Sequence, residues 1–85
     1  MNDVDFTISS HAAIEINRRN IRIEDIQQVL SRPQQVIAVK PSRNIYQSIV
    51  DVDGKQYLLR LVVDKEIPPV LVTVYRTSKI QKYWR

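Results

Sequence analysis

The chain has 85 residues and a net charge of +4, from 13 Lys and Arg against 9 Asp and Glu. This length accommodates one domain, so we treat residues 1–85 as a single domain, and a hydrophobic fraction of 44% is typical of a globular protein. The sequence has no cysteine and one histidine, which excludes disulfides and leaves too few ligands for zinc. We therefore predict no metal ion and no other cofactor.

The N-terminal residues give no targeting signal. Residues 1–10 lack a basic start followed by an apolar run, so no signal peptide is predicted. The apolar stretches are much shorter than the roughly 20 residues that cross a bilayer. We expect a soluble, cytoplasmic protein without a membrane partner.

A short strand and a helix are the first predicted elements. Residues 6–8 alternate like a strand, and Ser10 can cap a helix that runs from His11 to about Arg19. Asn20 suits the left-handed conformation that ends many helices. At 100° per residue, the helix has an apolar face and an opposite polar face. The apolar face contains Ala12, Ala13 and Ile16, and the polar face contains His11, Glu15 and Arg18.

A second helix is predicted over residues 23–31. Acidic residues in its first turn complement the helix dipole, and Pro33 ends it. The apolar side chains recur at helical spacing and form its buried face. They are Ile23, Ile26, Val29 and Leu30.

The rest of the chain is predicted to form strands. Segments 36–39, 45–52, 56–63 and 70–76 are rich in β-branched residues, and Asp53-Gly54 is a strong hairpin signal. Ser78 can cap a short terminal helix. The order β-α-α-β-β-β-β-α predicts an α+β fold, in which two N-terminal helices pack on a four- to five-stranded antiparallel sheet.

His11 is the only side chain whose ordinary pKa lies near neutrality. It can act as a general acid or base, and Glu15, one helical turn later, can orient it. The alternative is a solvated histidine on an ordinary polar helix face.

Arg60 is the most informative basic residue, because it interrupts the apolar run 57–63. If Val70, Val72 and Val74 face the helices, Thr73 and Tyr75 point to the other face of the sheet. With Arg60 on that face, the three side chains would suit a phosphate and a stacked base. The alternative is a surface arginine on a solvated sheet face.

Other side chains are weaker candidates for nucleic-acid binding. Arg outnumbers Lys, and guanidinium groups match phosphate geometry. The alternative for each basic residue among these candidates is an ordinary solvated charge. The candidates are Arg18, Arg43, Arg76, Thr77 and Lys79. Tyr83 and Trp84 are expected to pack with Ile80 at the terminus rather than to stack on a base.

Several motifs resemble a small family of bacterial toxins. The segments His11-Ala12 and Arg19-Asn20-Ile21, followed by a second helix and Pro33, are similar to the family's opening pattern H-A-x-x-R-x-x-x-R-G-I. Residues 72–79, Val-Thr-Val-Tyr-Arg-Thr-Ser-Lys, resemble its V-T-V-Y-x-T close. The family is that of BrnT and, more distantly, RelE and ParE, the toxins of type II toxin–antitoxin systems. The resemblance implies a metal-independent endoribonuclease that uses the 2′-hydroxyl of RNA and is neutralised by a cognate antitoxin.

The resemblance also implies roles for particular residues. His11 and Arg19 match the first motif, Arg60 the sheet arginine, and Tyr75 the closing strand together with Thr77. Arg19 and Arg60 would bind phosphate, and His11 or Tyr75 would transfer protons, so all four should gather in one cationic pocket. Two residues depart from the family pattern. Glu15 stands where the family usually has Arg, which removes one phosphate ligand, and Asn20 replaces Gly.

The expected partners are RNA and a small antitoxin that is acidic or carries an acidic segment. Two alternatives remain at this point. One is a non-catalytic nucleic-acid-binding or protein-interaction module with a degenerate toxin fold, which Glu15 favours. The other is an adaptor whose basic face meets an acidic protein.

Overall fold

A computed structural model describes residues 4–85 and confirms the predicted α+β fold and the order of its elements. The three helices and five strands are β1 (Thr7–Ile8), α1 (Ser10–Arg18), α2 (Ile23–Ser31), β2 (Gln35–Lys40), β3 (Arg43–Val52), β4 (Lys55–Asp64), β5 (Val70–Thr77) and α3 (Ile80–Tyr83). No helix in this part of the chain has the length and apolar character needed to cross a membrane.

The five strands form one mixed sheet in the order β1-β5-β4-β3-β2. Strands β2 to β5 form an antiparallel meander, as expected from their hairpin-length connections. Strand β1 differs from the prediction, because it pairs with β5 in parallel, with Thr7 opposite Val70. The chain enters the sheet beside β5 and turns at once into α1, so the parallel edge is only two residues long.

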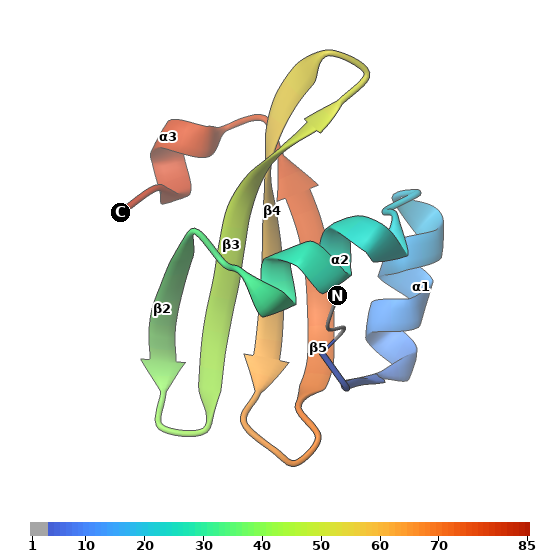
Figure 1. The fold of residues 1–85 in the computed structure, drawn as a ribbon, viewed down its shortest axis with the longest axis vertical. Coiled ribbons are helices and arrows are strands. Elements are labelled where there is room, and N and C mark those ends of the chain that lie inside the picture. Colours follow the sequence, from blue (N-terminus) through green and yellow to red (C-terminus); the bar gives the residue numbers. More distant parts are fainter. Residues whose placement is uncertain (1–3) are drawn as a thin grey trace.

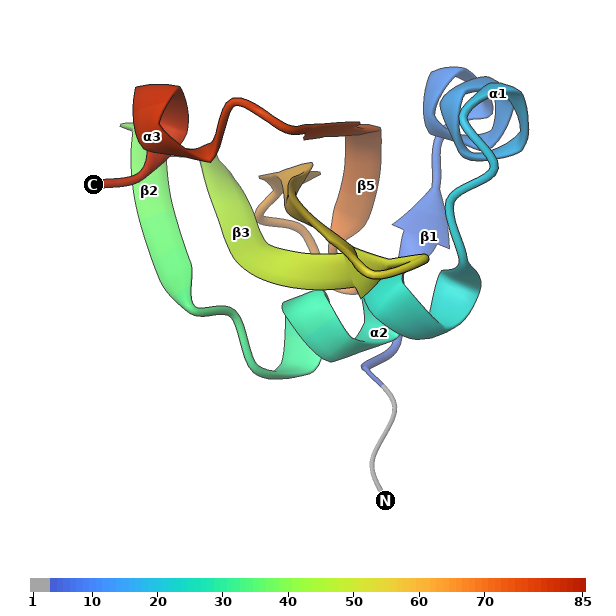
Figure 2. The ribbon, with the colours of Figure 1, turned by 90° about the horizontal axis from the view of Figure 1, so that it is seen from above.

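The helices divide the sheet into two different faces. Figure 2 shows α2 under one face, α1 alongside β5, and α3 on the opposite face. The hydrophobic core lies on the face covered by α1 and α2. Its buried side chains come from the two helices, the segment between them, β4 and β5. They are Ala12, Ile21, Ile26, Val29, Leu30, Leu59, Leu61, Val63, Leu71 and Val74.

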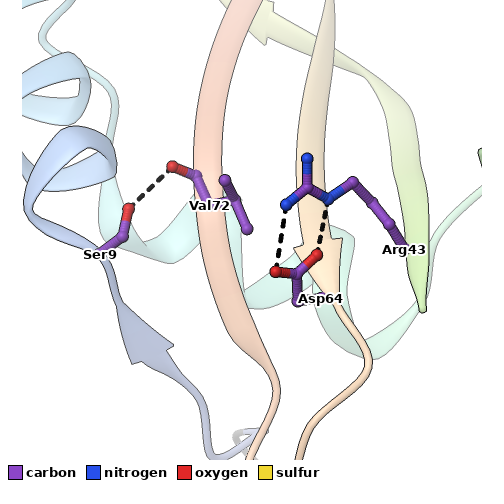
Figure 3. A network of polar contacts seen from close by, with 4 residues as sticks. All are labelled: Ser9, Arg43, Asp64 and Val72. Atoms are coloured by element: carbon purple, nitrogen blue, oxygen red, sulfur yellow. Dashed lines mark hydrogen bonds and ion pairs between the residues drawn. The ribbon is translucent and has the colours of Figure 1, made fainter.

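Ser9, rather than the predicted Ser10, caps helix α1. Its Oγ accepts a hydrogen bond from the Ala12 backbone N–H at 3.0 Å. It also donates one to the Val72 carbonyl at 2.8 Å, which Figure 3 shows. The cap therefore also ties α1 to β5. Ala12 is buried and Ile16 packs against the core as predicted, and His11 and Arg18 are exposed. The prediction was wrong for two residues of α1, because Ala13 is exposed and Glu15 is buried.

The bounds of α2 agree with the prediction, and Ile26, Val29 and Leu30 are buried as expected. Ile23 is the exception, with 46% of its surface exposed, because it lies in the first turn where the helix leaves the core. The Asp53-Gly54 hairpin is confirmed, with φ values of 52° and 80° that match a two-residue hairpin turn.

An irregularity in the sheet changes the expected inward side chains of β5. The register between β4 and β5 shifts between Val62 and Val63, and Leu71 and Val74 are the buried residues of β5. Of Val70, Val72 and Val74, which were assumed together to face the helices, only Val74 is therefore buried in the core. Helix α3 also starts differently, because Ser78 makes no cap.

Candidate phosphate-binding site on the open face of the sheet

Four polar side chains form a row across the face of the sheet that α1 and α2 leave uncovered. In the strand register, Gln35 lies opposite Gln47, Gln47 opposite Arg60, and Arg60 opposite Tyr75. Residues directly opposite each other in antiparallel strands point to the same face. Their neighbours Leu59, Leu61 and Val74 alternate with them and belong to the core. The predicted placement of Arg60 and Tyr75 on one face is confirmed.

Hydrogen bonds connect this polar row from end to end. Arg60 Nε donates to Gln47 Oε1 at 2.8 Å, and Arg60 Nη1 donates to the Tyr75 hydroxyl at 2.5 Å. Gln47 Nε2 donates in turn to Gln35 Oε1 at 2.8 Å. Gln47 is fully buried, so its amide fixes the position of the guanidinium rather than sharing it with water.

The segment around α3 covers the row. The Tyr83 ring lies over the guanidinium of Arg60, with 4.3 Å from Cζ to the ring centroid, and the Tyr75 ring lies at 5.6 Å. The Tyr83 carbonyl accepts a hydrogen bond from Gln47 at 3.2 Å, and Gln35 exchanges two hydrogen bonds with the backbone of Arg85. Tyr83 packs against the sheet as predicted, but its partner is a cation instead of the apolar core.

Arg60 is a buried cation without an acidic partner. Only 5% of its surface is exposed, and the ion pairs found within residues 4–85 belong to other arginines. A guanidinium has five N–H donors, of which the protein here engages two. Burying a charge without a counter-charge is costly, unless an anion completes the site. A phosphate group matches the planar donor edge that remains.

The unused donors of Arg60 are not sealed inside the protein. Among the described residues, every fully buried side-chain nitrogen or oxygen has a hydrogen-bond partner. Nη2 of Arg60 has no acceptor among residues 4–85, so it is not completely enclosed and keeps slight contact with solvent under the Tyr83 ring. The site thus holds a guanidinium beside two tyrosine rings, with only a small part of it in contact with solvent.

The structure does not bring His11 and Arg19 to this site. Helix α1 packs through Ala12 into the core, on the face of the sheet from which Arg60 points away. The prediction that His11, Arg19, Arg60 and Tyr75 gather in one pocket was therefore wrong. His11 is exposed on α1, which agrees with the alternative of a solvated histidine on a polar helix face.

Glu15 already neutralises the cations beside it on α1. Its Oε1 accepts a hydrogen bond from Arg19 Nε at 2.7 Å, and Arg18 lies at 3.8 Å. The hydrogen bond from Arg19 lowers the pKa of Glu15, and burial opposes this shift in part. Glu15 is only 8% exposed, which the helical periodicity did not predict. Its position is possible because Arg19 compensates the carboxylate.

None of the remaining candidates is hydrogen-bonded to Arg60 within residues 4–85. Arg43 shares that face, but it makes two hydrogen bonds of 2.6 and 3.1 Å with Asp64 (Figure 3). This pairing raises the pKa of Arg43 and lowers that of Asp64. Arg76 lies opposite Leu59, on the helix-covered face. Thr77 is on the Arg60 face, and its hydroxyl accepts a hydrogen bond from the Lys79 backbone at 3.0 Å.

Sequence reasoning missed Gln35, Gln47 and Tyr83. Gln47 carried a usable signal, because it interrupts the apolar alternation of Ile45 and Ile49 in β3 as Arg60 does in β4. No comparable signal marks Tyr83, which reaches Arg60 only through the fold. Within residues 4–85, no cluster of three His, Cys, Asp or Glu residues could hold a metal ion.

A family model described as "Domain of unknown function (DUF4258)" matches residues 8–76. The chain belongs to the DUF4258 family. The DUF4258 match runs from β1 to β5 and includes Arg60 and Tyr75, whereas α3 with Tyr83 follows it. No curated protein and no solved structure matches the chain.

Proposed function

We propose that this chain is a metal-independent RNA-cleaving domain of the toxin–antitoxin type, which acts in the cytoplasm and is neutralised by a small acidic antitoxin. The observation that supports the proposal is the buried guanidinium of Arg60, which has no carboxylate partner and is hydrogen-bonded to the hydroxyl of Tyr75. A phosphodiester is the anion that the proposed reaction requires at this position.

In this proposal, Arg60 and Tyr75 divide the chemistry between them. Arg60 binds the scissile phosphate and stabilises the charge that develops on it. Because Arg60 donates to the phenolic oxygen, Tyr75 keeps its own proton for another acceptor. The 2′-hydroxyl loses its proton to solvent and its oxygen attacks phosphorus. The bond to the 5′ oxygen breaks, this oxygen takes the Tyr75 proton, and a 2′,3′-cyclic phosphate remains. Tyr75 then regains a proton from water.

Access to Arg60 requires α3 to move. Arg60 is almost completely covered, and the Tyr83 ring lies directly on it. Helix α3 has four residues and contributes none to the hydrophobic core, so its displacement breaks its contacts with the polar row but leaves the core in place. Once displaced, the rings of Tyr75 and Tyr83 offer surfaces on which bases stack.

The test compares two glutamine-to-glutamate variants. Gln47→Glu places a carboxylate against Arg60, and Gln28→Glu makes the same change at an exposed position on α2. The assay measures binding and cleavage of a fluorescent 20-nucleotide RNA and of its DNA counterpart. We expect cleavage of the RNA only, loss of binding in Gln47→Glu, and unchanged behaviour in Gln28→Glu. If Gln47→Glu binds RNA as the wild type does, Arg60 is not the phosphate ligand.

A second candidate is an RNA-binding domain without catalytic activity. The position of His11 favours it, because the one histidine, a common general acid or base, lies away from Arg60. The variant Tyr75→Phe separates the two candidates. A ribonuclease loses cleavage in this variant and keeps RNA affinity, whereas a binding domain shows salt-dependent affinity and no cleavage in either form.

A further inference from the structure

Strand β2 forms a free edge of the sheet. It is the last strand in the order β1-β5-β4-β3-β2, and β3 is its only neighbour within residues 4–85. An edge strand directs part of its backbone N–H and C=O groups away from the sheet, where another strand can pair with them. The opposite edge offers much less, because β1 has two residues.

The composition of β2 suits strand pairing. Residues 35–39, Gln-Val-Ile-Ala-Val, contain no charge and no proline, and three of them are β-branched. Val36 is 51% exposed and Val39 is 54% exposed. Proteins usually protect such edges with charges, proline or bulges. Here the register shift and Lys40 lie at one end of the strand, so residues 35–38 form an unprotected edge.

Cations flank this edge at both ends. Lys40 ends the strand and Arg32 precedes it. Arg85 lies next to Gln35, because its backbone makes two hydrogen bonds with the Gln35 side chain. All three cations are exposed, and residues 26–50 contain no Asp or Glu. The local field therefore attracts an acidic segment.

We infer that β2 pairs with an extended segment of a partner protein, whose β-branched centre is flanked by acidic residues. The partner adds a sixth strand to the sheet through backbone hydrogen bonds, and its carboxylates meet the flanking cations. That this partner is an antitoxin rests on the proposed function. The argument for the surface rests on β2 alone.

A second copy of this chain fits the edge less well. Antiparallel pairing of two β2 strands about Ile37 would place Lys40 of one copy opposite Gln34 of the other, close to Arg32. Like charges brought together across a strand pair are destabilising. The net charge of +4 on each chain adds to this repulsion.

Three synthetic peptides test the inference against the full chain. The acidic probe is Glu-Glu-Val-Thr-Ile-Thr-Val-Glu-Glu. One control replaces its glutamates with lysines, and the other replaces the central isoleucine with proline. We expect the acidic probe to bind at least about tenfold more tightly than either control. Amide hydrogen exchange should slow specifically in residues 35–40.

Two variants of the protein complete the test. Val36→Glu should lower the affinity of the protein for the acidic probe by about tenfold. Val36→Thr should keep this affinity within about threefold of the wild-type value. Both changes are at an exposed side chain, so the fold should be preserved. The inference fails if no probe binds below about 1 mM, or if the lysine control binds equally well. It also fails if sedimentation shows a wild-type dimer that Val36→Glu disrupts. RNA affinity is measured on the same samples, so a failure of RNA binding is seen separately.

Discussion

The hydrogen bonds of Gln47 offer a quantitative test of the polar row. Gln47 is fully buried, and its amide accepts from Arg60 and donates to Gln35 and to the Tyr83 carbonyl. The substitution Gln47→Leu removes all three hydrogen bonds with a modest change in volume. It leaves the Arg60 Nε–H buried without an acceptor.

The loss at Arg60 dominates the expected change in unfolding free energy. A hydrogen bond to a charged group contributes about 1.5–3 kcal/mol, and a neutral one about 0.5–1.5 kcal/mol. The buried leucine recovers part of this loss through its apolar surface. We expect Gln47→Leu to lower the free energy of unfolding by about 2–4 kcal/mol. In a domain of this size, that corresponds to a fall in Tm of roughly 10–25 °C.

Urea and thermal unfolding, followed by circular dichroism, measure this change. The matched variant combines Gln47→Leu with Arg60→Met. The second substitution removes the cation that Gln47→Leu alone leaves without its hydrogen-bond acceptor. We expect the double variant to recover at least about 1 kcal/mol relative to Gln47→Leu. If Gln47→Leu lies within about 0.5 kcal/mol of the wild type, Arg60 does not depend on Gln47. If the changes in unfolding free energy caused by Gln47→Leu and Arg60→Met are simply additive, the two side chains are not energetically coupled.

Three further predictions concern packing and pH. Leu61→Ala should lower the unfolding free energy by about 2–5 kcal/mol in urea titrations, because Leu61 is fully buried in the core. Arg43 holds the pKa of Asp64 below its usual range, so the stability from this pair is present at neutral pH and is lost as pH falls through that lowered pKa, below about pH 4. The urea midpoints of Asp64→Asn and wild type should therefore differ at neutral pH and converge at pH 2. The same reasoning applies to Glu15, whose pKa Arg19 lowers. Glu15→Gln should be less stable than wild type at neutral pH, and the difference should vanish in acid.

The parts of the fold that were predictable depend on neighbouring residues in sequence. The bounds of α2 follow from its apolar spacing and from Pro33, and the hairpin follows from Asp53-Gly54. The parallel pairing of β1 with β5 joins Thr7 to Val70, and no local signal encodes a contact across that distance. The register shift near Val62 is equally hidden, because it depends on how two strands meet.

The candidate site was predictable only where strand alternation applies. Alternation placed Tyr75 on the face away from the helices and left open whether Arg60 shares it. The strand register shows that it does. The helical periodicity of α1 failed at Glu15 because it treats every charge as solvated. Glu15 is buried since Arg19 compensates its carboxylate. His11 is away from the site that the toxin resemblance implied because α1 packs on the face of the sheet opposite Arg60.

The energetic cost of Arg60 is the strongest argument that it serves a ligand. Its neighbours on the same face of β4 are Leu58 and Val62, so an apolar side chain would fit the strand. Replacing a buried ion and its partners with apolar residues is often neutral or stabilising by about 1–4 kcal/mol. A domain of 85 residues has a total stability of only about 4–13 kcal/mol. The double variant Arg60→Met/Gln47→Leu should therefore unfold within about 1 kcal/mol of the wild type, yet lose RNA affinity. A variant that is strongly destabilised and still binds RNA would show that Arg60 holds the sheet and α3 together instead.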